Sequence, residues 1–321
     1  MTKRRRVRLG IIGAGFGQYV HLPAFRSVPE CRVVAIAAGS LKSAERAARQ
    51  GRIPKAYGDW RKLVRDPEVD AISIAVPPVL QPGIARLALK YGKPVFYEKP
   101  LAVTLKAAQP LWRAARRSKL AQMADFELTA IPEWQKAKAF IRGGGIGRAR
   151  HMAVNWQVQT HVNKSGARSW KTQNAKGGGV VLQFAPHMLH YLEWFFGPIT
   201  KLFADISAAA DSPAKGETLL SLTARFKNGA SASVSIGTHS IGGSGHQLEF
   251  YGDKGSLKLF IAPEKKSRDA RIAMVSQLAK KFIRWARTGK PQTPDLKEAF
   301  RVQELLEAVR VSGRKGRWVK V

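Results

Sequence analysis

Three groups of residues in this sequence have types and spacings that could do chemistry. Gly13-x-Gly15 follows a short apolar run, and Lys99 follows another; His187 lies in a third segment, four residues after Gln183. A glycine loop can bring backbone N–H groups to a pyrophosphate, and a lysine can stabilise a developing alkoxide. A histidine can move a proton near neutral pH. Together these groups indicate a nucleotide-binding enzyme.

The glycine loop matches the first part of a dinucleotide-binding fingerprint. Gly13 would make the tight turn, and Gly15 would let the backbone approach the pyrophosphate. The third glycine is expected at 18, where the chain has Gln18, with Gly17 one place early. We expect cofactor contacts from the loop and from neighbouring strand ends: Gly13, Gly15, Phe16, Gly17, Gln18, Ser40, Lys42, Val76, Pro77, Glu98 and Lys99.

The end of the second apolar run bears on the choice of cofactor. NAD sites commonly carry a carboxylate about 20 residues beyond the loop, where it binds the ribose hydroxyls. Here residues 37–42 read AAGSLK, and no acid occurs before Glu45. Ser40 and Lys42 could contact a 2′-phosphate, or Ser40 could be only a helix cap and Lys42 a solvated charge. The sequence favours NADP(H) over NAD(H).

Strands that alternate with helices would position these groups. Apolar runs at 7–12, 31–37, 71–76, 95–97 and 120–126 are separated by helical patterns near 20–26, 40–49, 81–91 and 108–115. This alternation predicts an α/β domain over residues 1–126 with a doubly wound parallel sheet, a Rossmann domain. Ligands bind at the carboxyl ends of such strands, where the glycine loop and Lys99 fall.

The remaining residues, 127–321, have another pattern and form the second predicted domain. Helices are expected near 132–142, 181–196, 271–288 and 295–311, and the last could pack back on the Rossmann domain. Strands are expected near 148–159, 200–208, 217–226, 230–238, 246–251 and 256–261. Turn signals between them, such as Asn228-Gly229, predict a mostly antiparallel sheet.

The glycine loop, GKPVFYEKPLAVT at 92–104 and GGGVVLQFAPHMLHYLEWFFG at 177–197 together resemble the Gfo/Idh/MocA oxidoreductases. The resemblance extends along nearly the whole chain, including EAFRVQELLEAV at 298–309. It implies a nicotinamide-binding Rossmann domain followed by an α/β domain with a large open sheet. Many members form dimers or tetramers through that sheet, so a homodimer or homotetramer is expected. Members mostly oxidise or reduce a hydroxyl or carbonyl on sugars, sugar nucleotides, inositols and related compounds.

The resemblance also implies roles for individual residues. Lys99 matches the family's lysine and would polarise the reacting oxygen, while Glu98 would orient Lys99 or contact the nicotinamide ribose. His187 matches the family's acid/base histidine. Gln183 stands where the family usually has an aspartate; it can hydrogen-bond a substrate hydroxyl but cannot take a proton. Catalysis would then rest on Lys99 and His187, or activity has been lost.

The segment 160–176 is polar and irregular, and its Trp170 and Lys171 suit a sugar or nucleotide ligand. The expected substrate contacts are Lys99, Trp170, Lys171, Gln183 and His187. A metal site is not expected, because His187, His190 and Glu193 lack HExxH spacing and the chain has one cysteine, Cys31.

Composition limits the partners. Lys+Arg number 55 and Asp+Glu 22, a formal net charge of +33, which attracts anions unless it is only a solvated surface. A small anionic or polyhydroxylated substrate is therefore expected. The basic residues are spread along the chain without a recognition-helix or RNA-binding motif, so specific nucleic-acid binding is not expected. No apolar run is long enough to span a membrane, and glycines interrupt the stretch after the basic run at 3–8, so a cytoplasmic protein is expected.

The leading hypothesis is an NAD(P)-dependent oxidoreductase that transfers a hydride between nicotinamide and a hydroxyl or carbonyl of a sugar, sugar nucleotide or related polyol. One alternative is a non-catalytic dinucleotide-binding regulator or scaffold, supported by Gln183 and the +33 charge. Another is a reductase of a non-sugar substrate, similar to biliverdin reductase, which apolar residues around the cleft would favour.

Overall fold

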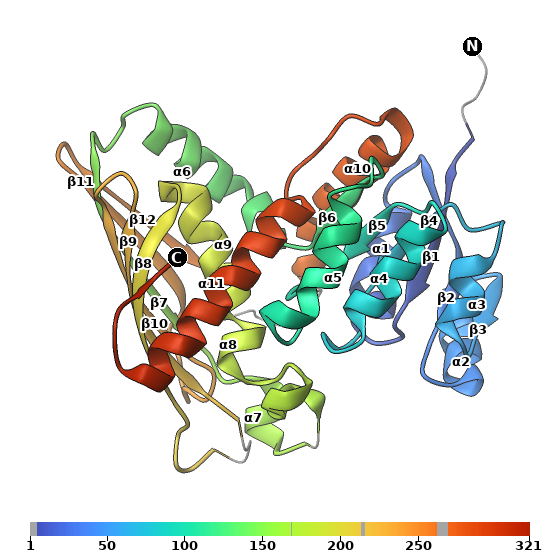
Figure 1. Cartoon of the computed structure of the whole chain (residues 1–321), viewed down its shortest axis with the longest axis horizontal. Helices are drawn as coiled ribbons and strands as arrows, with labels where there is room; N and C mark the ends of the chain where they lie inside the picture. The colour runs from blue at the N-terminus through green and yellow to red at the C-terminus, as the bar shows by residue number, and fades with distance from the viewer. Residues whose placement is uncertain (1–4, 168, 213–215, 262–268) are drawn as a thin grey trace. The chain divides into compact units, whose positions relative to one another are not determined.

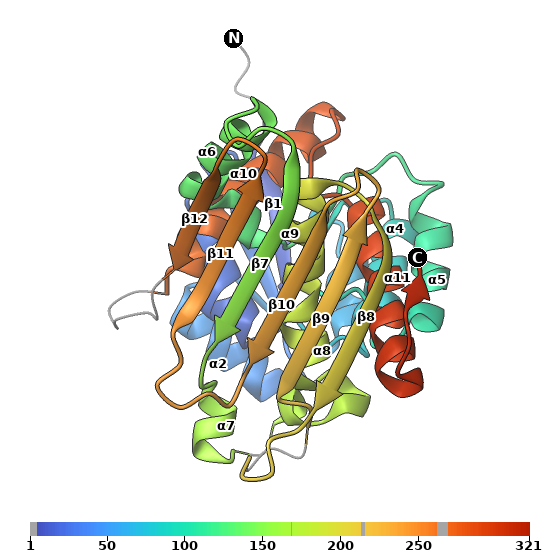
Figure 2. The same cartoon turned by 90° about the vertical axis from the view of Figure 1, so that its left-hand side faces the viewer.

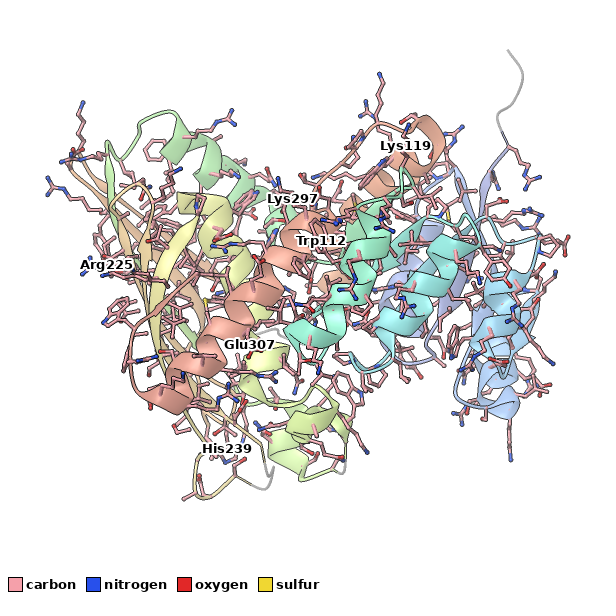
Figure 3. The ribbon with its side chains drawn as sticks, viewed as in Figure 1. Trp112, Lys119, Arg225, His239, Lys297 and Glu307 are labelled. Carbon is pink, nitrogen blue, oxygen red and sulfur yellow. The ribbon has the colours of Figure 1, made fainter. Side chains whose placement is uncertain are left out.

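A computed structural model describes residues 5–167, 169–212, 216–261 and 269–321 (Figure 1). The chain forms two compact units. Unit 1 comprises Met1–Ala130 and Ser267–Phe300, and unit 2 comprises Ile131–Lys266 and Arg301–Val321. Exposed cations occur on both units, for example Lys119 and Lys297 on unit 1 and Arg225 on unit 2 (Figure 3). Among the described residues, no helix has the length and apolar character needed to cross a membrane.

Unit 1 is built on a six-stranded parallel sheet. Its strands follow the order β3-β2-β1-β4-β5-β6, so β1 lies at the point where the order reverses. The strands are β1 (Val7–Ile12), β2 (Cys31–Ala37), β3 (Lys55–Tyr57), β4 (Ala71–Ile74), β5 (Val95–Tyr97) and β6 (Gln122–Ala124). The central strands are buried and rich in branched apolar residues, as expected for a sheet covered on both faces. The predicted Rossmann architecture is confirmed.

The helical elements of unit 1 are η1 (Gly17–His21), α1 (Leu22–Arg26), α2 (Leu41–Gly51), α3 (Trp60–Arg65), α4 (Gln81–Lys90), α5 (Leu105–Ala115), η2 (Glu127–Ala130) and α10 (Arg271–Thr288). α10 follows unit 2 in the sequence, and the expectation from the sequence grouped it with residues 127–321. It packs in unit 1, where Phe282 meets Phe25 and Phe96 edge-on at ring-centroid distances of 6.1 and 5.7 Å.

Unit 2 contains a seven-stranded sheet with the order β12-β11-β7-β10-β9-β8-β13. Its strands are β7 (Ala149–Gln157), β8 (Ile199–Ser207), β9 (Leu219–Phe226), β10 (Ser231–Gly237), β11 (Gly245–Gly252), β12 (Ser256–Ile261) and β13 (Val319–Lys320). Only the β7–β10 pair is parallel among these strands, so the predicted mostly antiparallel sheet is confirmed. Figure 2 shows one face of this sheet toward the viewer, with α8 and α9 behind it.

The helical elements of unit 2 are α6 (Pro132–Arg142), α7 (His161–Ser165), η3 (Trp170–Thr172), η4 (Asn174–Lys176), α8 (Gly179–Gln183) and α9 (Ala185–Phe196). α11 (Leu296–Lys315) begins in unit 1 and continues into unit 2. The single helix expected at 181–196 is wrong, because the segment breaks at Phe184 between α8 and α9. Pro186 explains the break, since it has no N–H to donate to the carbonyl of Leu182.

Candidate dinucleotide and catalytic sites

The glycine loop ends β1 and has the geometry that a close backbone approach requires. Gly13 has φ +124°, and a Cβ built on it would lie 2.1 Å from the carbonyl oxygen of Ala75. Only glycine fits there without moving the backbone. A Cβ on Gly15 would meet nothing within 4 Å, so the space beside Gly15 is open. The two glycines therefore differ: Gly13 is required by the fold, and Gly15 leaves room for a ligand.

Gly17 does the packing that the third glycine of the fingerprint usually does. A Cβ at Gly17 would lie 2.9 Å from Cγ2 of Ile11 and 3.3 Å from Cβ of Ala75. Gly17 opens η1, a π-type turn that leads directly into α1. Gln18, which occupies the expected third position, is half-buried and donates a hydrogen bond to the side chain of Gln50 at 2.9 Å. Close helix–strand packing is thus kept with the glycine one residue early.

Four other predicted cofactor residues of unit 1 follow β4 and β5, the two strands that come after β1 in the sheet order. Val76 and Pro77 come after β4, and Glu98 and Lys99 come directly after β5. The backbone N–H of Glu98 donates to the carbonyl of Ile74 at 3.0 Å, which continues the β4–β5 pairing past the strand end. Because β1, β4 and β5 are consecutive and parallel, their carboxyl ends share one edge of the sheet. The structure brings these loops together as predicted.

Ser40 and Lys42 lie at the start of α2, and both are exposed. The Ser40 hydroxyl accepts a hydrogen bond from the backbone N–H of Ser43 at 3.2 Å and donates to its hydroxyl at 3.1 Å. Ser40 therefore caps α2. The first turn of α2 holds no acidic residue, so no carboxylate lies at the start of this helix.

Sequence analysis missed a buried charged cluster behind Glu98. The imidazole of His21 lies between Ser73 and Glu98, with Nδ1 2.7 Å from the Ser73 hydroxyl and Nε2 2.9 Å from Oε1 of Glu98. Oδ2 of Asp125 is 3.3 Å from the same Nε2. The side chains of His21 and Asp125 are fully buried, and that of Glu98 is 14% exposed. The one available signal was that Glu98 follows a predicted strand and that Asp125 is an acidic residue within another apolar run, 120–126.

The cluster shifts the pKa of each of its members. Burial by itself lowers the pKa of His21, but the carboxylates of Asp125 and Glu98 outweigh it and raise the pKa to about 9. Burial and the charge of Glu98 raise the pKa of Asp125 to about 7. Burial opposes ionisation of Glu98 too, yet His21 and Lys99 hold its pKa below the usual value. Burial and Asp125 raise the pKa of Glu127 well above the usual value.

The predicted residues of unit 2 gather around α8 and α9. His187 and His190 are buried in α9, with 6% and 5% of their surface exposed. His187 lies beside Trp156, at a ring-centroid distance of 6.4 Å. Gln183 ends α8, so the continuous helical face expected for Gln183 and His187 is wrong. Glu193, the third residue weighed as a metal ligand and not expected to be one, accepts hydrogen bonds from Arg301 and from the backbone N–H of Ile199.

Gln183 and the 169–173 segment are tied together. Nε2 of Gln183 donates to the carbonyl of Lys171 at 2.5 Å, and a Cβ on Gly178 would lie 2.4 Å from that same carbonyl. Trp170 and Lys171 lie in η3, where Trp170 is half-buried and Lys171 exposed. A small pocket of unit 2 is lined by Lys171, Gln183 and Phe184, and also by Thr160, Val162, Asn163, Thr172, Gly179, Gly216, Glu217 and Thr238.

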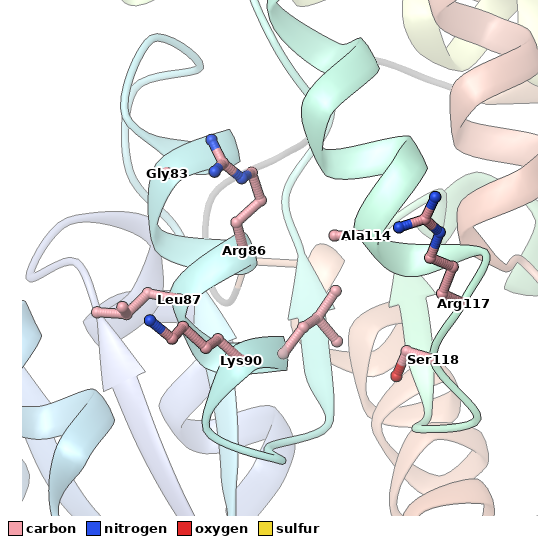
Figure 4. A pocket seen from close by; sticks show the side chains of 8 residues that line it. Gly83, Arg86, Leu87, Lys90, Ala114, Arg117 and Ser118 are labelled. Carbon is pink, nitrogen blue, oxygen red and sulfur yellow. The ribbon is translucent and has the colours of Figure 1, made fainter.

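A larger groove in unit 1 lies elsewhere (Figure 4). It has a volume of about 680 Å³ and lies between α4 and the end of α5, with three cationic side chains, Arg86, Lys90 and Arg117, in its lining. The carboxyl ends of helices in an α/β sheet lie at the opposite edge from the carboxyl ends of the strands. This groove is therefore separate from the edge that holds the glycine loop and Lys99.

Comparison with known proteins agrees with the fold and the glycine loop. Residues 7–126 match an oxidoreductase family with an NAD-binding Rossmann fold, and residues 134–258 match the GFO/IDH/MocA C-terminal domain. The two matches define a class, the oxidoreductases that use a nicotinamide cofactor. The chain belongs to the Gfo/Idh/MocA family of these dehydrogenases.

Several relatives align with most of the chain. An uncharacterised oxidoreductase of Synechocystis is 29% identical, over 100% of this chain and 98% of its own. Levoglucosan dehydrogenase of Pseudarthrobacter phenanthrenivorans is 25% identical, over 79% of this chain and 73% of its own. A structure of levoglucosan dehydrogenase with NADH superposes with a TM-score of 0.89 at 22% identity, covering 99% of both chains. The structure of myo-inositol 2-dehydrogenase of Lactobacillus plantarum superposes with a TM-score of 0.88 at 18% identity, covering 99% of this chain and 100% of its own. These structures show that the fold is shared.

Proposed function

We propose that this dehydrogenase oxidises a secondary hydroxyl of a sugar or polyol, or reduces the matching carbonyl, with Lys99 and His187 as its reacting side chains. The observation that carries the proposal is the shared strand edge of unit 1, where the glycine loop ends β1 and the Glu98–Lys99 turn ends the nearby β5. Gly13, Gly15 and Gly17 have the turn, the open space and the packing that a dinucleotide needs. When bound, the nicotinamide supplies or accepts the hydride.

The side chains supply proton transfer and charge. In the oxidation, His187 takes the proton of the substrate hydroxyl while the C–H bond gives up its electron pair as hydride. The ammonium of Lys99 donates a hydrogen bond to the oxygen as it becomes a carbonyl and stabilises its alkoxide character. Gln183, Trp170 and Lys171 bind other hydroxyls of the substrate, and Gln183 acts only as a hydrogen-bonding group.

Replacing His187 by asparagine is expected to reduce kcat by about 10²–10⁴-fold, the contribution of a general acid/base, with little change in cofactor affinity. The pH dependence of kcat should also change, because the imidazole that moves the proton is gone. His190→Asn is the matched control, since His190 is equally buried one turn along α9. Steady-state rates from pH 5 to 9 test this, and equal losses in the two variants would contradict a special role for His187.

The substrate class follows from two observations. Relatives of the same family are named as levoglucosan and myo-inositol dehydrogenases, which act on small polyhydroxylated compounds. The formal net charge of +33 favours an anionic member of that class, such as a uronate or a sugar nucleotide. We further propose a homodimer or homotetramer through the face of the unit 2 sheet seen in Figure 2, where Ser233 and Ser235 are exposed.

We propose that NADP(H) binds more tightly than NAD(H), because residues 37–42 carry no carboxylate to repel a 2′-phosphate. Ser40→Asp is expected to reverse this preference, lowering NADPH affinity about tenfold or more while NADH affinity changes little. Aspartate is also a good helix cap, so α2 should be kept. Ser43→Asp, within the first turn of α2, is the charge-matched control. Equal affinity of wild type for both cofactors would contradict the proposal.

The first experiment is a parallel fluorescence titration of the purified chain with NADPH and NADH at about 0.15 M salt, which limits non-specific attraction. Binding of one with a changed nicotinamide emission supports the dinucleotide site, and turnover is then assayed on levoglucosan, inositols, uronates and sugar nucleotides. Binding without turnover of any would favour the regulator or scaffold. Turnover only with an apolar carbonyl or alkene would favour a biliverdin-reductase-like activity. Failure of both cofactors to bind would refute the proposal.

A further inference from the structure

The cluster of His21, Ser73, Glu98 and Asp125 holds more acidic groups than can ionise together without a cation. One donor or acceptor atom from each of His21, Glu98 and Asp125 lies within 4.8 Å of the others. Two buried carboxylates this close repel each other strongly. Nε2 of His21 lies 2.9 Å from Oε1 of Glu98 and 3.3 Å from Oδ2 of Asp125. A proton on each imidazole nitrogen would satisfy Ser73 and Glu98 together and supply the missing positive charge.

His21 also connects two parts of the dinucleotide edge. The ring of Phe16, within the glycine loop, meets His21 edge-on at a centroid distance of 5.2 Å, and the guanidinium of Arg271 lies over the Phe16 ring at 4.9 Å. Phe96 of β5 contacts His21 in the same manner at 5.3 Å. Glu98, which His21 holds, is the residue directly before Lys99. A substitution of His21 is therefore expected to disturb both the cofactor loop and Lys99.

We propose that His21 is a positioning residue for the dehydrogenase reaction: as an imidazolium, it holds the Glu98 carboxylate at the end of β5 and thereby fixes the place and charge environment of Lys99. The kinetic part rests on the proposed function of Lys99. The charged state of His21 does not, and it is measured independently of turnover.

The carboxylates that contact His21 favour its protonated form. Glu98 follows β5, Asp125 follows β6 and Glu127 begins η2, and all three are acidic. The cations nearby are Lys99, whose charge acts on Glu98 and Glu127, and Arg271 beyond Phe16. The carboxylate oxygens of Glu98 and Asp125 lie 2.9 and 3.3 Å from Nε2 of His21, and together they outweigh the effect of burial on its charge. Hence we expect His21 to stay protonated through neutral pH and to titrate near pH 9.

The first test is nuclear magnetic resonance of the full chain labelled with ¹⁵N-histidine, without cofactor. The chain has seven histidines, and the signals absent from His21→Gln identify His21. The expected result is an imidazolium spectrum at pH 7.5 with both ring nitrogens protonated. Asp125→Asn, which keeps the shape of the side chain, should lower the titration midpoint of His21 by about one pH unit. A neutral His21 at pH 7.5 would overturn the proposal, as would a shift of its signals on adding Mn²⁺ or Zn²⁺, which would indicate a metal site.

The second test separates positioning from simple packing. His21→Gln is expected to lower kcat about 10- to 100-fold, less than loss of a group that bonds the reacting oxygen, with KM for the cofactor changed less than about threefold. Its loss of thermal stability should be large at pH 7 and small at pH 10. The reason is that a raised histidine pKa contributes stability that is complete below pH 6.5 and is lost as pH rises through about 9.

His246→Gln is the matched control. His246 is also buried, stacks on Trp156 at 4.1 Å and lies 3.0 Å from the Tyr191 hydroxyl, but burial lowers its pKa to about 3, so it is neutral. Its stability loss should not depend on pH between 7 and 10. A kcat of His21→Gln within twofold of wild type would refute positioning even if the imidazolium is found. If His21→Gln does not fold, Asp125→Asn replaces it as the test. A lowered titration midpoint of His21 together with a lowered kcat would then support the proposal, and an unchanged midpoint or kcat would refute it. If wild type fails to bind nicotinamide cofactors, the proposed function falls while the spectroscopic result stands.

Discussion

Lys99→Met is expected to lower kcat by about 10²–10³-fold while NAD(P)H affinity stays within about threefold of wild type. Methionine keeps the length of the side chain but removes both its charge and its hydrogen-bond donors. The loss is expected to appear in the chemical step, because a preformed donor at a developing alkoxide stabilises the transition state more than the ground state. Pre-steady-state rates of nicotinamide absorbance change, measured with saturating substrate, give the effect on that step directly.

Lys106→Met is the matched control for this prediction. Lys106 is an exposed lysine in the first turn of α5, seven residues further along the chain, so the same substitution changes the net charge equally. A general effect of charge on the attraction of anionic ligands would lower kcat/KM in both variants and would weaken with salt. Wild-type kcat in Lys99→Met would show that Lys99 is only a loop charge.

The strands that hold the candidate site were predictable because each is an apolar run closed by residues that break strands. β1, β2 and β5 begin and end where the sequence predicts. β3 and α3 were missed: β3 is three half-buried residues, and α3 is six residues rich in arginine and lysine, so neither shows an apolar pattern over a useful length. The break at Phe184 could have been predicted from Pro186, but the apolar run on both sides of it favoured one helix.

The buried cluster was not predictable because its members are far apart in the sequence. His21, Ser73, Glu98 and Asp125 meet only because the strand order sets β4, β5 and β6 side by side after β1. Ser73 and His21 also lie inside regular elements, where an isolated polar residue gives no sign of its partner. Lys99 and His187 became candidates from residue types and family resemblance, whereas the charge environment of Lys99 could be described only from the folded chain.

A second large effect is expected from alanine at two glycines of one loop, with different consequences. Gly13→Ala should reduce both stability, by about 1–3 kcal/mol, and cofactor affinity, because its Cβ would strike the Ala75 carbonyl at 2.1 Å and its φ of +124° is strained for alanine. Gly15→Ala should leave the melting temperature unchanged, because its Cβ meets nothing within 4 Å in the free protein. Its NAD(P)H affinity should nevertheless fall about 100-fold, since the methyl group would occupy the space that the pyrophosphate needs.

The contrast between the two variants is what distinguishes a cofactor loop from an ordinary tight turn. If the loop is a turn that binds no ligand, Gly13→Ala lowers stability, and Gly15→Ala changes neither stability nor cofactor affinity. Gly83→Ala on α4 is the control: its Cβ also meets nothing within 4 Å, and alanine is a better helix former than glycine, so stability should hold or rise and affinity should not change. Thermal melts and fluorescence titrations of the three variants together measure both quantities. Wild-type affinity in Gly15→Ala would mean that the dinucleotide does not pass over this glycine, and the site would then have to be sought away from the β1 loop.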